Sequence, residues 1–308
     1  MATKTVPAGQ VVAPARPRSS IAWERRAFVL PAVIATLAVV IFPTIFGIYV
    51  SFTDWQRAST AGRVFNGLDN FRRMWNDDAF WTALKNNLMF VVIGVPIQYV
   101  IAFGLALLLN QEIRGRKFFR VVFLIPFMMS PIAIGWMVGR AVLDARYGPV
   151  AWALDELGFR ATFYDTGLKA VFTLILINAW YAIPFMLVML LAGLQALPHE
   201  VFEAAKIDGA SRWASFRDIT FPLMLPVSLT AIVLRVVFEF KLIDIIQVVT
   251  GGGPGSSSQT LSFYVYKEGF LSGNIGYGTA MAEVFLIFVI IFVTILIAIF
   301  SRWLRRVT

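Results

Sequence analysis

The sequence predicts an all-α membrane protein with six transmembrane helices, and three observations lead to this fold class. Hydrophobic residues make up 58% of the 308 residues and charged residues only 15%, against roughly 45–50% and 25% in soluble domains. The mean hydropathy is +0.74. Uncharged runs, most of them close to the ~20 residues that a helix needs to cross a bilayer, recur along the chain.

Each of these runs is assigned to one helix. The run 27–53 is too long for the apolar part of a signal peptide, about 7–15 residues, so it is expected to be a retained helix. The run 219–234 is short, and the expected helix continues through the apolar residues around Arg235 and Glu239. The six helices are expected at residues 27–50, 84–109, 119–140, 170–194, 219–245 and 277–301.

The basic residues predict that both chain termini are cytoplasmic. With the N-terminus inside, the inner segments carry a net charge of +9 and the outer segments +1, and Lys and Arg hold short loops in the cytoplasm. The formal net charge of +9 is therefore explained by topology, and nucleic acid is not an expected partner. Residues 1–20 are rich in Ala, Pro and Val and are expected to form a disordered cytoplasmic tail, with residues 21–308 forming the membrane domain.

Several chemistries are excluded by what the sequence lacks. The absence of cysteine excludes disulfides, thiolate metal sites and cysteine nucleophiles. The single histidine, His199, excludes a histidine-rich metal centre, and we expect no metal site and no chemistry from it. A G-x-x-x-x-G-K-[ST] phosphate loop does not occur, so the chain is not expected to bind ATP by that route.

The segment 197–222 predicts a helix–turn–helix elbow between the fourth and fifth spans. Pro198 suits the first turn of a helix, Gly209 allows a sharp exit after Asp208, and Ser211 can cap a second short helix that runs to Ile219. A rigid elbow on a protein without a nucleotide site suggests an external motor, because an elbow that docks on an ATPase would transmit its movement to the helices that carry it.

The elbow resembles the "EAA" loop of ABC importer permeases. That pattern is Glu-Ala-Ala, three residues, Gly, nine residues, Ile, one residue, Leu-Pro. This sequence has Glu203-Ala204-Ala205, Gly209, Ile219 and Phe221-Pro222, with Phe221 in place of Leu as the only departure. The resemblance implies that Glu203, Ala204, Ala205, Asp208 and Gly209 couple the chain to the ATPase.

A second segment resembles the carbohydrate-uptake branch of this family, within it the maltose-transporter subunit type that carries a Gly-Gly-Pro segment. It comprises 249–254, which reads Val-Thr-Gly-Gly-Gly-Pro, then Tyr266 and Phe270, then Gly276-Tyr277-Gly278. Together the two resemblances cover residues 25–305. They imply an ABC type I importer permease in the plasma (inner) membrane, which is not itself an enzyme.

The resemblance also implies the partners and the cofactors of such an importer. The chain would pair with a homologous second permease subunit, a dimeric ABC ATPase that binds ATP and Mg, and a soluble extracytoplasmic solute-binding protein. It would bind no cofactor of its own. The substrate would be a sugar, polyol or glycoside.

The resemblance places the substrate site on the fourth and fifth spans. On the fourth span the matched positions are Asn178, Tyr181, Ala182 and Phe185, of which Asn178, Tyr181 and Phe185 share one helix face by their i, i+3 and i+7 spacing. Helix packing would explain the same residues. Sugar binding is favoured because aromatic rings suit the C–H faces of a sugar and an amide suits its hydroxyls.

On the fifth span the matched positions are Arg235, Phe238 and Glu239. Charged residues within a span usually face a cavity or a partner. Arg235 departs from the neutral polar residue expected there, and two interpretations stay open. Arg235 and Glu239, at i and i+4, could form an ion pair. Alternatively, the guanidinium could bind an anionic substrate.

Two other classes of function remain as alternatives. In a self-contained secondary transporter or channel, Arg235, Glu239 and Glu283 could relay ions. A membrane-embedded enzyme would need a catalytic constellation, and the sequence shows no paired-carboxylate signature for one. The elbow motif argues against both.

Overall fold

The computed structural model describes residues 28–60, 62–159 and 162–307, so the tail predicted at residues 1–20 lies outside the described part. The chain divides into two compact units, residues 1–49 and 50–308. The described part of the first unit is helical and belongs to the helix Phe28–Ser51, which contains a π-helical turn, η1 (Leu37–Ile41), and α2 (Phe42–Ser51).

The second unit is a helical bundle. Its first half contains α3 (Asp69–Trp75), α4 (Asp78–Met89), η2 (Phe90–Gly94), α5 (Val95–Asn110), α6 (Arg116–Met128), α7 (Pro131–Ile134), η3 (Gly135–Val142) and α8 (Pro149–Glu156). Its second half contains α9 (Gly167–Gln195), α10 (His199–Ile207), α11 (Arg212–Ser215), η4 (Phe216–Thr220), α12 (Phe221–Phe240), α13 (Asp244–Val249), α14 (Leu261–Tyr266), η5 (Lys267–Leu271) and α15 (Ile275–Val307).

Within the described residues, five helices are long and apolar enough to cross a membrane, and a bent pair brings the number to six. The continuous helices are Phe28–Ser51, Asp78–Asn110, Gly167–Gln195, Arg212–Phe240 and Ile275–Arg302. The all-α fold class and the places of these spans are confirmed, with two corrections to the predicted bounds.

The third predicted span, 119–140, is not one helix. Arg116–Met128 and Pro131–Val142 are separate helical segments that bend by 96° at the break. Pro131 explains the break, because its ring disfavours helical geometry at the residue before it, and Ser130 is extended, with φ −65° and ψ 139°.

The fifth predicted span, 219–245, begins earlier and ends earlier than expected. Its helix starts at Arg212, within the elbow, and ends at Phe240. The carbonyl oxygen of Phe240 accepts hydrogen bonds from Ser262 Oγ at 2.7 Å and from Asn87 Nδ2 at 3.4 Å. These side chains satisfy a carbonyl that the helix leaves unpaired at its end.

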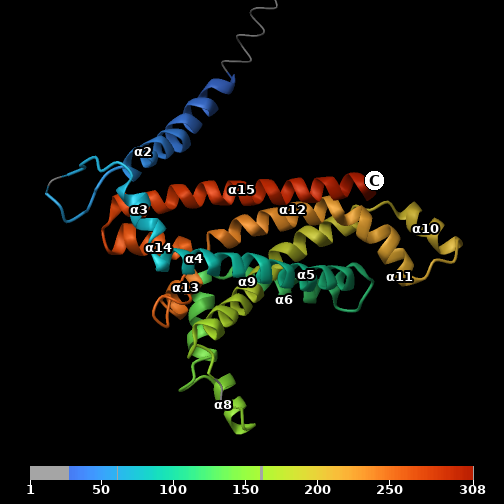
Figure 1. The fold of residues 1–308 in the computed structure, drawn as a ribbon. Coiled ribbons are helices and arrows are strands. Elements are labelled where there is room, and N and C mark those ends of the chain that lie inside the picture. Colours follow the sequence, from blue (N-terminus) through green and yellow to red (C-terminus); the bar gives the residue numbers. More distant parts are fainter. Residues whose placement is uncertain (1–27, 61, 160–161, 308) are drawn as a thin grey trace, which may run out of the picture. The chain divides into compact units, whose positions relative to one another are not determined.

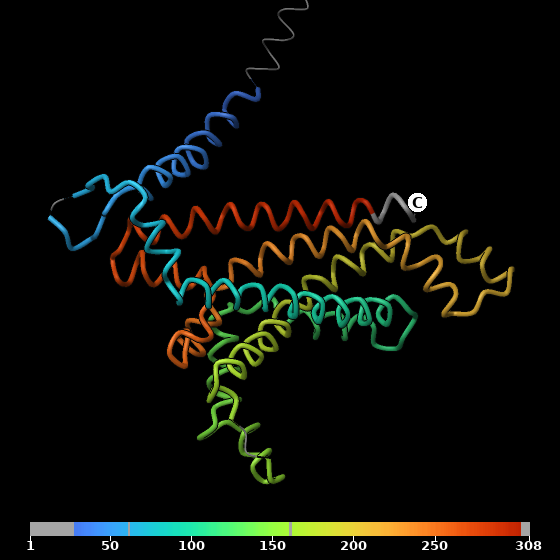
Figure 2. Tube along the Cα trace, in the orientation of Figure 1, coloured from blue at the N-terminus to red at the C-terminus, as the bar shows by residue number. Residues whose placement is uncertain are grey.

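The long helices of the second unit pack around α9 and α12. α9 contacts α5 and α12, and α12 contacts α15 (Figure 1). A buried apolar cluster joins three of these helices, with Phe103 and Leu109 on α5, Met186 and Leu190 on α9, and Met224 on α12. We call the end of the unit that carries α10 and α11 the elbow end, and the end that carries α13 and α14 the far end (Figure 2).

At the far end, asparagines of α4 bond to the backbone that follows the Gly-Gly-Pro segment. The side chain of Asn86 donates to the backbone oxygens of Ser257 and Gln259, at 2.8 and 2.9 Å. Asn87 Oδ1 accepts from the backbone N–H of Leu261 at 2.6 Å. The segment forms turns, as its glycines predict, and these bonds tie it to the start of the second span.

A carboxylate also ties helices together at the far end. Asp77 caps α4 by accepting from the N–H of Ala79 at 2.9 Å, and its other oxygen accepts from the hydroxyls of Tyr264 and Tyr277, at 2.6 and 2.5 Å. Burial alone would raise the pKa of Asp77, but these hydrogen bonds outweigh it and hold the pKa below its ordinary value.

Candidate functional site

The predicted substrate residues separate into two adjoining groups, and the first is a buried polar network. Arg235 pairs with Glu239, one helical turn further along α12. The other carboxylate oxygen of Glu239 accepts from Asn178 Nδ2 on α9 at 2.6 Å. Arg235 Nε donates to Gln98 Oε1 on α5 at 2.6 Å. Three membrane-spanning helices are therefore joined through one ion pair.

This network is almost completely shielded from solvent. Glu239 and Gln98 have no exposed surface, Asn178 is 1% exposed and Arg235 6%. A buried charge is tolerated when it is paired and hydrogen-bonded, and both conditions hold for Arg235 and Glu239. Gly94 permits the close approach of α5, because a Cβ at this position would lie 3.3 Å from Glu239 Oε1.

The second group is a cluster of aromatic rings beside the network. Phe185 on α9 packs edge-on against Phe238 on α12, with 5.5 Å between ring centroids. Phe127 on α6 contacts Tyr181 and Phe185, at 5.7 and 5.8 Å. Phe238 is 49% exposed and Phe127 42%. The rings thus form an accessible surface next to a buried polar network.

The residues of the site differ from the predicted ones in three respects. Gln98 on α5, which is not among the predicted site residues, is a member of the polar network. Phe127 joins the aromatic cluster from the broken third span, and no sequence signal pointed to it. Ala182 is fully buried, so a ligand does not reach its methyl group in this conformation.

The predicted elbow is present and well defined. α10 ends at Ile207, and Gly209 follows with φ +73°. The N–H of Gly209 bonds to the oxygen of Lys206 at 3.1 Å, and that of Ala210 to the oxygen of Ala205 at 2.9 Å. This bond pair is a Schellman cap, whose left-handed residue is usually glycine.

The chain turns back from this cap into the fifth span. Ser211 Oγ accepts from the N–H of Ala214 at 3.2 Å, as a helix N-cap does. The second helix does not end at Ile219 as predicted but continues into α12. Glu203, Ala204 and Asp208 are exposed on the elbow, and Ala205 is buried.

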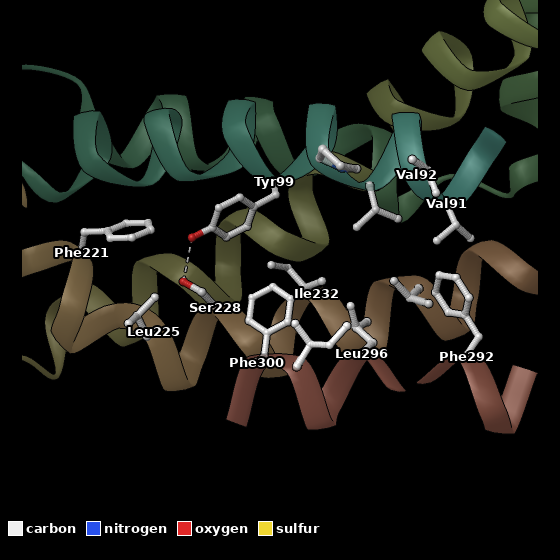
Figure 3. A pocket seen from close by; sticks show the side chains of 14 residues that line it. Val91, Val92, Tyr99, Phe221, Leu225, Ser228, Ile232, Phe292, Leu296 and Phe300 are labelled. Carbon is white, nitrogen blue, oxygen red and sulfur yellow. Dashed lines mark hydrogen bonds between the residues drawn. The ribbon is translucent and has the colours of Figure 1, made fainter. Parts of the chain in front are cut away.

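A large apolar cavity of about 580 Å³ lies apart from both groups, between η2–α5, α12 and α15 (Figure 3). Figure 3 shows Tyr99 facing Ser228 among valine, leucine and phenylalanine side chains, and the tyrosine hydroxyl donates to Ser228 Oγ at 2.9 Å. These two hydroxyls bond to each other, so the cavity offers few polar groups to a sugar.

The family model for the binding-protein-dependent transport system inner membrane component matches residues 98–307. A probable ABC transporter permease of Pyrococcus horikoshii is 34% identical, over 86% of this chain and 91% of that protein. The trehalose/maltose transport system permease MalF of Thermococcus litoralis is 32% identical, over 86% and 89%. The sulfoquinovosyl glycerol transport system permease SmoG of Agrobacterium fabrum is 32% identical, over 82% of each chain.

The fold also has relatives among solved structures. A chain of a bacterial alginate ABC transporter, in complex with an alginate-bound periplasmic protein, superposes with a TM-score of 0.74 over 94% of this chain and 96% of that one, at 21% identity. A second alginate transporter structure gives a TM-score of 0.71 over 94% and 97%, at 22% identity. The family match spans both the elbow and the candidate site, and the chain therefore belongs to the inner-membrane permease components of binding-protein-dependent ABC transport systems.

Proposed function

We propose that this permease forms one half of a heterodimeric pore that imports a sugar, polyol or glycoside, with a homologous permease as the other half. The observation that carries the proposal is the aromatic surface of Tyr181, Phe185 and Phe238, which lies beside the polar network of α5, α9 and α12. Rings of this kind suit the apolar faces of a sugar, and relatives named for trehalose/maltose and sulfoquinovosyl glycerol transport support the substrate class.

The polar network is proposed to contribute hydrogen bonds and to hold the aromatic surface in place. Gln98 Oε1 accepts from Arg235 Nε at 2.6 Å, and the Gln98 amide lies beside the carboxylate of Glu239. Asn178, Ala182, Arg235 and Glu239 are proposed as the floor of the site, beside the rings. They are buried in this conformation, so the helices would have to move before a substrate could contact them.

The geometry favours a structural ion pair over an anion-binding Arg235. The guanidinium already bonds to Glu239 and Gln98, and the pair has no net charge. We therefore propose that the substrate contacts at this level are made with hydroxyls rather than with an anionic group. The alternative in which Arg235, Glu239 and Glu283 relay ions in a self-contained transporter loses its support with the membership of the ABC permease family.

The elbow is proposed to dock on a dimeric ATPase that binds ATP and Mg, with Glu203, Ala204, Ala205, Asp208 and Gly209 at the contact. The exposure of Glu203 and Asp208 supports this role. The elbow and both termini would then lie in the cytoplasm, and a soluble binding protein would deliver the substrate at the far end.

The substrate site is tested by uptake into proteoliposomes that contain the complete transporter, with the sugar identified by screening the soluble binding protein. Phe185→Ala removes the ring that contacts both Phe127 and Phe238, and we expect uptake to fall by about tenfold or more, the equivalent of about 1.4 kcal/mol. Leu176→Ala, at a 61% exposed position of the same helix outside the cluster, is the matched control. Equal uptake by both variants would refute the proposed site.

A further inference from the structure

A second cavity, of about 560 Å³, lies at the elbow end between α10, α11–η4 and the ends of α5 and α9. We call it the elbow groove. Its lining is mixed: Lys206 and Arg212 contribute cationic groups, and the other side chains are apolar, such as Leu107, Leu197 and Phe202, or uncharged polar, such as Asn110, Gln111 and Ser215. Asp and Glu do not occur among the described residues that line it. The groove is therefore amphipathic, with one sign of charge.

The two cations of the groove are free to bind an external anion. Neither Lys206 nor Arg212 takes part in an ion pair among the described residues, and both are exposed. Their placement differs from that of Arg217, which bonds to Asp218. Guanidinium and ammonium groups recognise phosphate through charge-assisted hydrogen bonds.

The apolar part of the lining and the position of the groove favour a lipid over a soluble anion as the ligand. The groove adjoins Gln111 on one side and Leu197 on the other, which is where the uncharged runs of the second and fourth spans end. The ends of the spans lie at the membrane interface, where the headgroups of the lipids adjoin their acyl chains. The volume of the elbow groove also lies in the range of ordinary ligand-binding sites.

We propose that the elbow groove binds the phosphate headgroup of an anionic phospholipid of the cytoplasmic leaflet, with Lys206 and Arg212 on the phosphate and the leucine and phenylalanine side chains on the first part of the acyl chains. Basic groups near the inner membrane surface attract such lipids. The inference rests on the proposed cytoplasmic position of the elbow and adds a ligand to it.

Lipid binding is measured on the purified permease–ATPase complex in detergent by native mass spectrometry, with phosphatidylglycerol and with phosphatidylcholine of matched chains. The wild-type complex is expected to retain phosphatidylglycerol preferentially. The variant Lys206→Gln/Arg212→Gln should weaken this binding by about tenfold, as expected for the loss of charge-assisted bonds. The control Arg114→Gln/Lys117→Gln removes the same charge from the connection between α5 and α6 and the first turn of α6, and it should leave the binding within about twofold of wild type.

Three results would overturn the proposal. They are equal retention of both lipids by the wild type, equal loss of binding in the two double variants, and displacement of the lipid by millimolar inorganic phosphate. A phosphatidylglycerol with a photoreactive acyl chain gives a readout that needs no variant. It should label the segment 194–216 of the wild-type complex, and labelling confined to other segments would count against the groove. Because neither assay measures transport, failure of the lipid site is distinguishable from failure of the proposed uptake.

Discussion

Arg235 and Glu239 differ from the other ion pairs of the chain in their surroundings. The pairs Arg72–Asp69 and Lys169–Asp165 are largely exposed, and such pairs contribute about 0–1 kcal/mol each. The side chains of Arg235 and Glu239 are 8% and 0% exposed. Each charge therefore needs the opposite charge of its partner to offset the loss of hydration. Loss of one partner of a buried pair costs about 3–5 kcal/mol, whereas removal of both is often tolerated.

We therefore expect Arg235→Ala to reduce both uptake and the melting temperature of the complex, because Glu239 is left buried and unpaired. The double variant Arg235→Ala/Glu239→Ala should recover much of both. Uptake and thermal unfolding of the same preparations check this. A double variant that is stable but inactive would indicate instead that Arg235 or Glu239 acts on the substrate.

Asp77 gives a pH-dependent prediction at the far end. Its pKa is lowered in the folded chain from an ordinary value of 3.8, so the carboxylate stabilises the fold above about pH 4 and loses this effect as the pH falls through the lower, folded pKa. Asp77→Asn retains only one acceptor oxygen, so either the N–H of Ala79 or the two tyrosine hydroxyls lose their acceptor, which costs about 1 kcal/mol.

Asp77→Asn should accordingly lower the melting temperature at pH 6 by roughly 2–4 °C and should show a smaller further decrease at pH 3 than wild type. Thermal unfolding in detergent across this pH range is the measurement. Asp69→Asn, at an exposed carboxylate paired with Arg72, is the control and should resemble wild type. Parallel pH profiles for wild type and Asp77→Asn would show that Asp77 does not carry this dependence.

For individual residues, the sequence predicted contacts within a helix but not contacts between helices. The i, i+4 spacing of Arg235 and Glu239 was sufficient to place them on one face. The bonds to Asn178 and Gln98 depend on how α5, α9 and α12 approach one another, and a single sequence holds no periodicity that specifies this.

Among the helices, the third span shows that hydropathy alone does not predict a break in the backbone. The run 121–139 contains no charge and was assigned a continuous helix, yet Pro131 interrupts it and the chain bends by 96°. Hydropathy measures transfer of side chains into lipid and does not register backbone geometry. Phe127, which contacts Tyr181 on α9, lies in the last turn of α6 just before this break.

The elbow was predicted more completely, because its turn residues specify its geometry. Gly209 has the positive φ that its place after a helix requires, and Ser211 caps the next helix. Gly209→Pro is incompatible with φ +73°, since proline fixes φ near −65°, and it removes the N–H that bonds to Lys206.

We expect Gly209→Pro and Glu203→Lys each to abolish uptake while the chain remains inserted in the membrane. The first change disrupts the turn and the second reverses a charge at the proposed ATPase contact. Uptake, membrane insertion and co-purification of the ATPase are measured together. Glu112→Lys, an exposed charge reversal outside the elbow, should transport normally. Transport by both elbow variants with the ATPase still attached would exclude the elbow as the coupling element.

For the molecule as a whole, the chain is a transport component rather than an enzyme, and its sequence contains no phosphate loop. The purified chain alone should therefore hydrolyse no ATP, whereas the complex with the proposed ATPase should. Phosphate release by each preparation is the measurement. Turnover by the isolated chain that survives removal of contaminating ATPases would contradict the assignment.

The continuity of Arg212–Phe240 has a mechanical consequence. Arg212 lies in the elbow, and Arg235 is 23 residues further along the same helix, a rise of about 35 Å at 1.5 Å per residue. The segment can act as a lever arm between the proposed ATPase contact and the proposed substrate site. A tilt of about 10° around its elbow end would move the end at the substrate site by roughly 6 Å, more than the length of a hydrogen bond. A small stroke at the ATPase would thus be enough to separate Glu239 from Asn178 and open the floor of the substrate site.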